Sequence, residues 1–482
     1  MNTPLRRLAS MVLVMFLVLI GSATSVQVFQ ANRLNNDPRN VRTLYREFGS
    51  ARGPIVAAGT AVASSVPSDD PFRYQRSYAA GDLYSAVTGF YSIANGASGL
   101  ESVENDVLTG RGDQLFFSRV RDLLTGRSPE GAAVETTILP AAQQAARDGL
   151  GDQQGAVVAI DPSTGAILAL VSTPGFDPNQ LAVHDSAAAG AAYTALAAAP
   201  GNPLRSNATR ERYAPGSTFK LITAAAALSA GYTTATPLSS PRELALPGST
   251  ATIQNFGGES CGGDTVSLAD ALRISCNTAF AQLGMDLGND AIAAQAAAFG
   301  FGDDSLRIPL AVVESVVPTG LDAAQTAQSA IGQRDVQATP LQMAMVAAGI
   351  ANGGVVMRPY LVATVRAADL SVVSQASPQQ YSVAMTPANA AALRDMMLGV
   401  VQSGTGKAAQ IPGVQVAGKT GTAQTTQGAA PNAWFTAFAP ADAPRVAVAV
   451  LVEHGGSMGN DATGGQVAAP IAKAVMEAVL AQ

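Results

Sequence analysis

A serine and a lysine three residues apart, Ser217 and Lys220, have a spacing that could support nucleophilic chemistry. The residues before them, 213–216, contain a proline and a glycine that interrupt helices, and the residues after them are apolar and helix-forming. Ser217 is therefore expected at the start of a helix, with Lys220 on the same face. A neutral lysine amine placed there can accept the serine proton and make the hydroxyl a nucleophile. The alternative is a helix-capping serine followed by a surface lysine.

Lysine is scarce in this sequence, so each one is informative. Arginine stays protonated in proteins, whereas a desolvated lysine can lose its proton and act as a base. Chemistry that needs a neutral amine therefore cannot exchange lysine for arginine. Among the 29 basic residues, the lysines are Lys220, Lys407, Lys419 and Lys473. A surface position is the simpler interpretation for Lys407 and Lys473.

The composition excludes several kinds of protein. The 482 residues include only 2 histidines and 2 cysteines, too few for a multi-histidine metal site or a zinc knuckle, so neither a metal nor a cofactor is expected. The net charge is -6 and the basic residues are dispersed, which argues against nucleic acid as a partner. Hydrophobic residues make up 48% of the chain and charged ones 13%, against about 25% in typical domains, so disorder is excluded.

Two further motifs follow Ser217 in a meaningful order. Ser275-Cys276-Asn277 lies in a stretch with helical character, and Lys419-Thr420-Gly421 follows a predicted strand. The order Ser-x-x-Lys, Ser-x-Asn, Lys-Thr-Gly resembles the motif set of penicillin-binding proteins and serine β-lactamases. Two of the scarce lysines fall inside these motifs.

The resemblance extends over the whole chain. Further segments look like class B penicillin-binding proteins, most of all the actinobacterial penicillin-binding protein A type: residues 52–55, 155–171, 332–333, 339–344, 351–354 and 433–438. The resemblance implies an α+β fold: a penicillin-binding-protein/serine β-lactamase-like transpeptidase domain with an antiparallel sheet packed with helices, an N-terminal pedestal domain and one transmembrane helix.

The resemblance also implies roles for the motif residues. Ser217 attacks the penultimate D-Ala of a stem peptide, Lys220 is its base, and Ser275 relays a proton to the leaving group. Asn277 binds the substrate backbone, and Lys419 and Thr420 face the terminal carboxylate. The substrate-binding strand comprises Thr420, Gly421 and Thr422, and the backbone N–H groups of Ser217 and Thr422 form the oxyanion hole.

The function implied is a peptidoglycan D,D-transpeptidase that crosslinks stem peptides of the lipid II-derived nascent glycan and is inhibited covalently by β-lactams. The Glu-x-x-x-Asn segment that class A β-lactamases use for deacylation is absent after Ser217. The match at Glu101 and Asn105 lies far upstream, where chance is the better interpretation. A D,D-carboxypeptidase and a non-catalytic peptidoglycan- or β-lactam-binding scaffold are the alternatives.

A nucleotide-binding protein is a rival from another class. Residues 413–420 satisfy the phosphate-loop pattern Gly-x-x-x-x-Gly-Lys-Thr. A phosphate loop, however, needs a flexible turn between a strand and a helix, and the intervening residues here are strand formers.

The amino terminus predicts a membrane anchor. Arg6 and Arg7 precede an uncharged apolar run long enough to span a bilayer. We expect a cytoplasmic tail at 1–7, a single transmembrane helix at 8–30, the N-terminus inside and the catalytic domain outside the cytoplasmic membrane. A cleaved signal peptide is the alternative.

The exported part divides near residue 150 into a pedestal, or dimerisation-like, domain at 31–150 and a transpeptidase domain at 151–482. Residues 156–160 and 166–171 predict a hairpin. Later strands are expected at 414–417, 433–438 and 445–452, and helices at 221–230, 267–283 and 339–351. The pedestal is too short for a glycosyltransferase, so a partner in a division or elongation complex must polymerise the glycan.

The two cysteines, Cys261 and Cys276, could form a disulfide in an exported protein. The closed loop would add about 3 kcal/mol to the free energy of unfolding.

Overall fold

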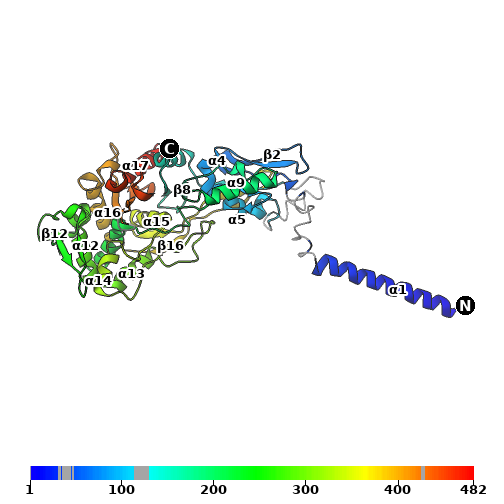
Figure 1. Ribbon diagram of the computed structural model, residues 1–482, viewed down its shortest axis with the longest axis horizontal. Coiled ribbons are helices and arrows are strands. Elements are labelled where there is room, and N and C mark those ends of the chain that lie inside the picture. The colour runs from blue at the N-terminus through cyan, green and yellow to red at the C-terminus, as the bar shows by residue number, and fades with distance from the viewer. Residues whose placement is uncertain are drawn as a thin grey trace.

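The computed structural model describes residues 2–30, 34, 45, 48–112, 115, 130–424 and 429–482. An N-terminal helix extends from a body made of a smaller and a larger part (Figure 1). This helix, α1 (Asn2–Thr24), continues through a π-helical turn at Ser25–Phe29. The span Thr3–Phe29 is the one helix in the described residues that is long and apolar enough to cross a membrane, and none of it is buried in the body.

A five-stranded antiparallel sheet forms the centre of the larger part, with the strand order β17-β18-β19-β7-β8. The predicted hairpin is confirmed as β7 (Gly155–Ile160) paired with β8 (Ile167–Thr173). Alternate residues point to opposite faces of a strand. Both faces of this sheet are apolar: Val158 belongs to one hydrophobic core and Val157 to another.

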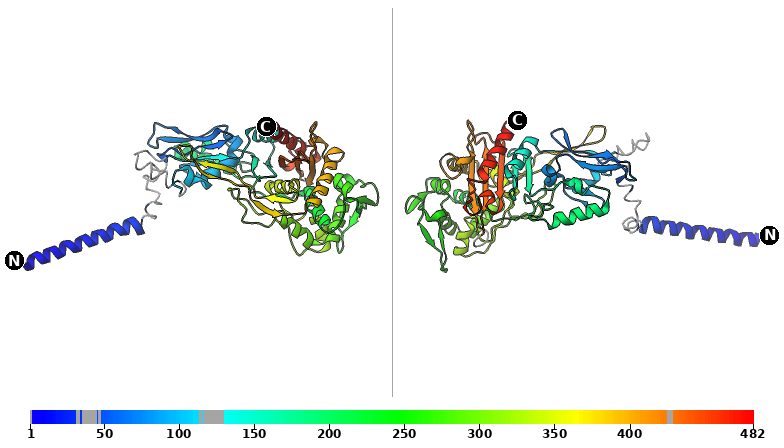
Figure 2. Two further views of the ribbon diagram at one scale, coloured as in Figure 1. Left: turned by 180° about the vertical axis from the view of Figure 1, so that it is seen from behind. Right: turned by 45° about the horizontal axis from the view of Figure 1, so that its top comes forward.

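Helices cover both faces of the sheet. Helix α15 (Pro340–Ala351) belongs to the core on one face, and α8 (Pro140–Leu150) and α17 (Ala468–Leu480) belong to the core on the other. In the right-hand view, the red α17 lies beside orange strands of this sheet (Figure 2). Helix α10 (Lys220–Ser229) is buried along almost its whole length because it packs among the helices α12 (Asn277–Leu287), α13 (Asn289–Ala298) and α16 (Pro387–Gln402).

The remaining elements of the larger part are β9 (Pro237–Ser239), β10 (Glu243–Ala245), β11 (Thr252–Gln254), β12 (Thr265–Ser267), α11 (Leu268–Arg273), α12 (Asn277–Leu287), α13 (Asn289–Ala298), α14 (Ala323–Ser329), β13 (Val355–Met357), β16 (Gln380–Val383), α16 (Pro387–Gln402), β17 (Ala417–Ala423), β18 (Asn432–Ala439) and β19 (Val446–Val452), with short 3-10 turns at Gly216–Phe219, Phe256–Gly258, Lys407–Ala409 and Glu453–Asp461. Helix α9 (Ser186–Ala198) and the 3-10 turn Pro178–Gln180 lie against the smaller part instead (Figure 1).

The smaller part is built on a six-stranded sheet with the order β15-β14-β6-β1-β2-β3. Two of these strands come from far along the chain. β14 (Val362–Arg366) pairs with β6, and β15 (Val372–Gln375) pairs with β14. The pedestal sheet is therefore completed by residues well beyond 150. Its other elements are β1 (Ile55–Ala57), β2 (Thr60–Pro67), β3 (Tyr74–Tyr78), α4 (Gly81–Thr88), β4 (Tyr91–Ser92), β5 (Gly96–Ala97), α5 (Gly99–Val103), α6 (Asn105–Leu108) and β6 (Ala133–Thr136).

A buried charge cluster lies inside the pedestal. The Glu101 carboxylate is fully buried and accepts hydrogen bonds from Arg52 Nε at 2.5 Å and Arg76 Nε at 2.6 Å. Arg52 also donates to Asn105 Oδ1 at 2.7 Å. Burying one carboxylate requires such compensation by nearby cations. The upstream Glu-x-x-x-Asn match is thus part of the pedestal's interior.

Two local predictions differ from the structure. The helix expected at 267–283 is interrupted: α11 ends at Arg273 and α12 begins at Asn277, so Ser275 lies in a loop with φ of 61°. The strand expected at 414–417 begins instead at Ala417, and Lys419-Thr420-Gly421 lies inside β17 rather than after a strand. The break between α11 and α12 was not predicted because both flanking segments favour a helix. The strand at Lys419-Thr420-Gly421 was not predicted because Gly418 and Gly421 disfavour strands.

Candidate active site

One cavity of about 350 Å³ lies beside β17 in the larger part. Residues from all three sequence motifs line it, although more than 200 positions separate the first motif from the last. The lining residues from these motifs are Ser217, Ser275, Cys276, Asn277 and Thr420, and Thr422 lines the cavity beside them. The fold therefore brings together the side chains that the sequence predicted as one site.

Ser217 lies in the 3-10 turn Gly216–Phe219, directly before α10. Gly216 has φ of 53°, and a Cβ atom there would lie 2.9 Å from the Thr422 carbonyl oxygen. Glycine thus allows the turn to approach β17 closely. The predicted position at a helix start is confirmed, with Ser217 half-buried at the cavity wall.

Lys220 is fully buried beneath this cavity. Its Nζ donates to the Ser275 carbonyl oxygen at 2.8 Å and to Asn277 Oδ1 at 2.7 Å. Burial, together with the neighbouring Lys419 cation, holds the pKa of Lys220 well below its ordinary value. The surface-lysine alternative is therefore wrong for this residue.

Lys419 is the second fully buried lysine. Its Nζ donates to Ser275 Oγ at 2.8 Å and to the Thr420 carbonyl oxygen at 2.9 Å. Burial lowers the pKa of Lys419 to about 7. Ser275 Oγ also lies 3.4 Å from Lys220 Nζ, so this hydroxyl stands between the two amines.

Gly421 has a packing role in β17. A Cβ atom there would lie 2.9 Å from both the Pro215 carbonyl oxygen and Trp434 Cβ. A side chain at this position would push the strand away from the turn that holds Ser217. Thr420 lines the cavity, and its hydroxyl shares a 2.6 Å hydrogen bond with that of Thr405.

The phosphate-loop rival is not supported by this geometry. The last residues of the pattern, Ala417 to Thr420, are extended and pair with β18. A phosphate loop would need a helix to begin directly after Thr420, but β17 continues there to Ala423. Within the described ranges, no group of three or more His, Cys, Asp or Glu side chains could hold a metal ion.

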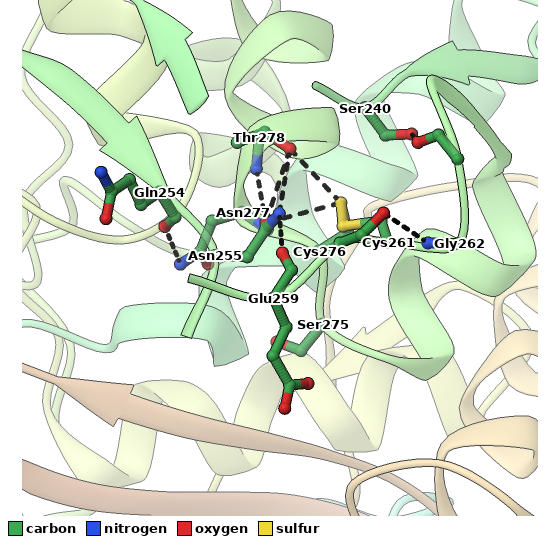
Figure 3. Close-up of a disulfide and its surroundings, with 12 residues drawn as sticks. Ser240, Gln254, Asn255, Glu259, Cys261, Gly262, Ser275, Cys276, Asn277 and Thr278 are labelled. Atoms are coloured by element: carbon green, nitrogen blue, oxygen red, sulfur yellow. Dashed lines mark hydrogen bonds between the residues drawn. A yellow bond between two sulfur atoms is a disulfide. The ribbon is translucent and has the colours of Figure 1, made fainter. Parts of the chain in front are cut away.

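Asn255 is a residue of this site that the sequence did not indicate. Its Oδ1 accepts hydrogen bonds from the backbone N–H groups of Asn277 at 2.8 Å and Thr278 at 3.1 Å (Figure 3). The residue at the N-cap position, Cys276, makes no side-chain capping bond, so Asn255 caps α12 from a distant segment. Asn255 lies 22 residues before Asn277 in the chain, so the sequence next to α12 holds no sign of this cap.

The segment 254–261 holds the Asn277 side chain by a hydrogen bond, and a disulfide links this segment to the residue before Asn277. Asn277 Nδ2 donates to the Gln254 carbonyl oxygen at 3.0 Å, which fixes the amide so that Oδ1 faces Lys220. Cys261 and Cys276 form a disulfide that joins this wall to the Ser275 loop (Figure 3). Both cysteines line the cavity. The wall and the second motif are therefore joined by hydrogen bonds and by a covalent bond.

Ser217 and Ser275 line one cavity, Ser275 Oγ lies between two buried lysine amines, and no histidine is among the lining residues. This is the arrangement of a serine-type acyltransferase. The family model for the penicillin binding protein transpeptidase domain matches residues 155–477, and that for the penicillin binding protein A dimerisation domain matches residues 52–134. The chain belongs to the class B penicillin-binding proteins, and within them to the penicillin-binding protein A type.

Named relatives are similar over the full length. The chain is 49% identical to the peptidoglycan D,D-transpeptidase PbpA of Mycolicibacterium smegmatis, covering 100% of this chain and 99% of the relative. It is 47% identical to PbpA of Mycobacterium tuberculosis H37Rv over the same shares. The solved structure of M. tuberculosis penicillin-binding protein A as a ceftriaxone acyl-enzyme complex has a TM-score of 0.88 at 46% identity, covering 90% of this chain and 100% of that one.

Replacing Asn255 separates its capping role from its other contacts. Asn255→Ala should lower the free energy of unfolding by about 1–2 kcal/mol and slow acylation by a fluorescent penicillin about tenfold, because the Ser275 loop loses its anchor. Asn255→Asp keeps the capping oxygen and should retain most of the stability and most of the acylation rate. Chemical denaturation and the acylation time course measure the two effects. Wild-type acylation by Asn255→Ala would contradict this positioning role.

Proposed function

We propose that this chain is a peptidoglycan D,D-transpeptidase in which Ser217 forms the acyl-enzyme with a stem peptide. The observation that supports this assignment is the convergence of three motifs on one cavity above two buried lysines. The names of the full-length relatives, and the β-lactam acyl-enzyme structure of one of them, support the same activity and covalent inhibition by β-lactams.

In this proposal Lys220 is the base that activates Ser217. A neutral amine has two N–H donors and one lone pair, and the Ser275 carbonyl and Asn277 Oδ1 occupy both donors. The lone pair is then left for the Ser217 proton. As the serine oxygen bonds to the carbonyl carbon of the penultimate D-Ala, the backbone N–H groups of Ser217 and Thr422 stabilise the oxyanion.

The departing D-Ala needs a proton, and Ser275 is placed to deliver it. Its hydroxyl lies within reach of both lysine amines, so the proton taken from Ser217 can pass from Lys220 through Ser275 to the leaving amine. Lys419 stabilises this arrangement by its charge, and with Thr420 it attracts the terminal carboxylate of the donor. Asn277 orients the substrate backbone.

The acyl-enzyme is then released by an acceptor amine, which forms the crosslink. We propose the domain assignment 1–7, 8–30, 31–150 and 151–482, with β14 and β15 contributed to the pedestal sheet from the last of these segments. Arg6 and Arg7 favour an inside N-terminus, which places the site outside the cytoplasmic membrane. A glycosyltransferase partner would supply the glycan.

A crosslinking assay tests the activity. With a peptide ending in D-Ala-D-Ala and an amine acceptor, the wild type should release D-Ala and form the crosslinked product, whereas Ser217→Ala should form neither. Chromatography and mass spectrometry quantify both products. Release of D-Ala without crosslinked product would favour a carboxypeptidase, and neither product would favour a non-catalytic scaffold.

The two lysines predict opposite limbs in the pH profile of acylation. The rate should rise with pH as Lys220 loses its proton, then fall as Lys419 loses its proton with a pKa of about 7. Arginine keeps its charge, so Lys419→Arg should lose the falling limb between about pH 6 and 9. Lys407→Arg, at an exposed position, is the matched control and should keep the wild-type profile. An unchanged falling limb in Lys419→Arg would refute this assignment.

A further inference from the structure

One charged side chain lines the groove around Ser217. The cavity of about 350 Å³ adjoins a second one of about 1150 Å³, and both share lining residues such as Asn255, Asn277 and Thr422. Among the described residues that line these two cavities, Glu259 is the only one with a formal charge. Its carboxylate is exposed and forms no ion pair with any residue that the structure describes.

The protein anchors the backbone from which this side chain extends. Asn255 Nδ2 donates to the Glu259 carbonyl oxygen at 3.0 Å. Two residues further on, Cys261 is joined by the disulfide to Cys276. The Glu259 side chain extends away from this disulfide (Figure 3). The backbone anchors that fix the second motif therefore also fix the origin of this side chain.

The chemistry of crosslinking identifies a cation that could meet it. An acceptor stem peptide must carry a side-chain amine, and donor and acceptor are strands of the same polymer. The donor therefore carries this amine too, on the residue before the penultimate D-Ala, and it is protonated at neutral pH. In an extended peptide, this side-chain ammonium can lie up to about 10 Å from the scissile carbonyl.

We propose that Glu259 is a specificity-determining residue that pairs with the ammonium on the third residue of the donor stem peptide. This inference rests on the proposed transpeptidase function. Phe256 and Ile331 line the same groove and offer apolar surface to the methylenes of that side chain. The terminal carboxylate of the donor binds near Thr420, so the substrate is held by opposite charges at two points.

The test compares two synthetic donors as competitors of acylation by a fluorescent penicillin: Nα-acetyl-L-Lys-D-Ala-D-Ala, which is cationic, and its Nε-acetylated form, which lacks that cation. The wild type should bind the cationic peptide about fivefold more tightly, as expected for an exposed ion pair. Glu259→Gln should abolish this preference. The ratio of the two competition constants is taken within each variant, so a change in the acylation rate itself cancels.

Salt and a matched control complete the experiment. The wild-type preference should shrink as salt is raised, because a solvent-exposed charge pair is screened. Glu477→Gln, which removes an exposed carboxylate on α17, should keep the preference. Equal competition by the two peptides, or no competition by either, on wild type that penicillin acylates normally would overturn the role of Glu259 alone. Wild type that penicillin does not acylate would overturn the proposed function, and this inference with it.

Discussion

The site depends on one electrostatic constraint: two lysine amines are buried under the same cavity, and both cannot easily carry a charge there. Neither Lys220 nor Lys419 has measurable exposure, and two ammonium ions this close in a desolvated place repel each other. The stable solution is one neutral amine and one cation with Ser275 between them. In the proposed mechanism, the same burial therefore supplies both a neutral amine that can act as the base for Ser217 and a cation that can attract a carboxylate.

The surrounding fold maintains this burial. Gly216 and Gly421 let the serine turn press against β17, which carries Lys419 into the core. On the opposite wall, Asn255 and the Cys261–Cys276 disulfide hold the Ser275 loop in its left-handed conformation. A strained loop residue is expected to persist only where its surroundings determine it this fully.

The sequence predicted the chemistry better than the local structure. The order of the three motifs and the scarcity of lysine identified the cavity residues, because those features depend on residue type alone. The break at Ser275 could not be predicted, since both flanking segments favour helix and the interruption is imposed by contacts from distant residues. Asn255, the β14–β15 strands of the pedestal and the burial of Glu101 were missed or undervalued for the same reason: each depends on pairing between segments far apart in the chain.

The most direct test of the account is the intact mass of the protein after exposure to penicillin, followed by peptide mapping of the adduct. The account predicts one covalent adduct on the peptide that contains Ser217, absent from Ser217→Ala and formed slowly by Lys220→Ala. Its persistence over hours would agree with an acyl-enzyme that waits for an amine. An adduct on another residue, or none on folded wild-type protein, would contradict the assignment of Ser217 as the nucleophile.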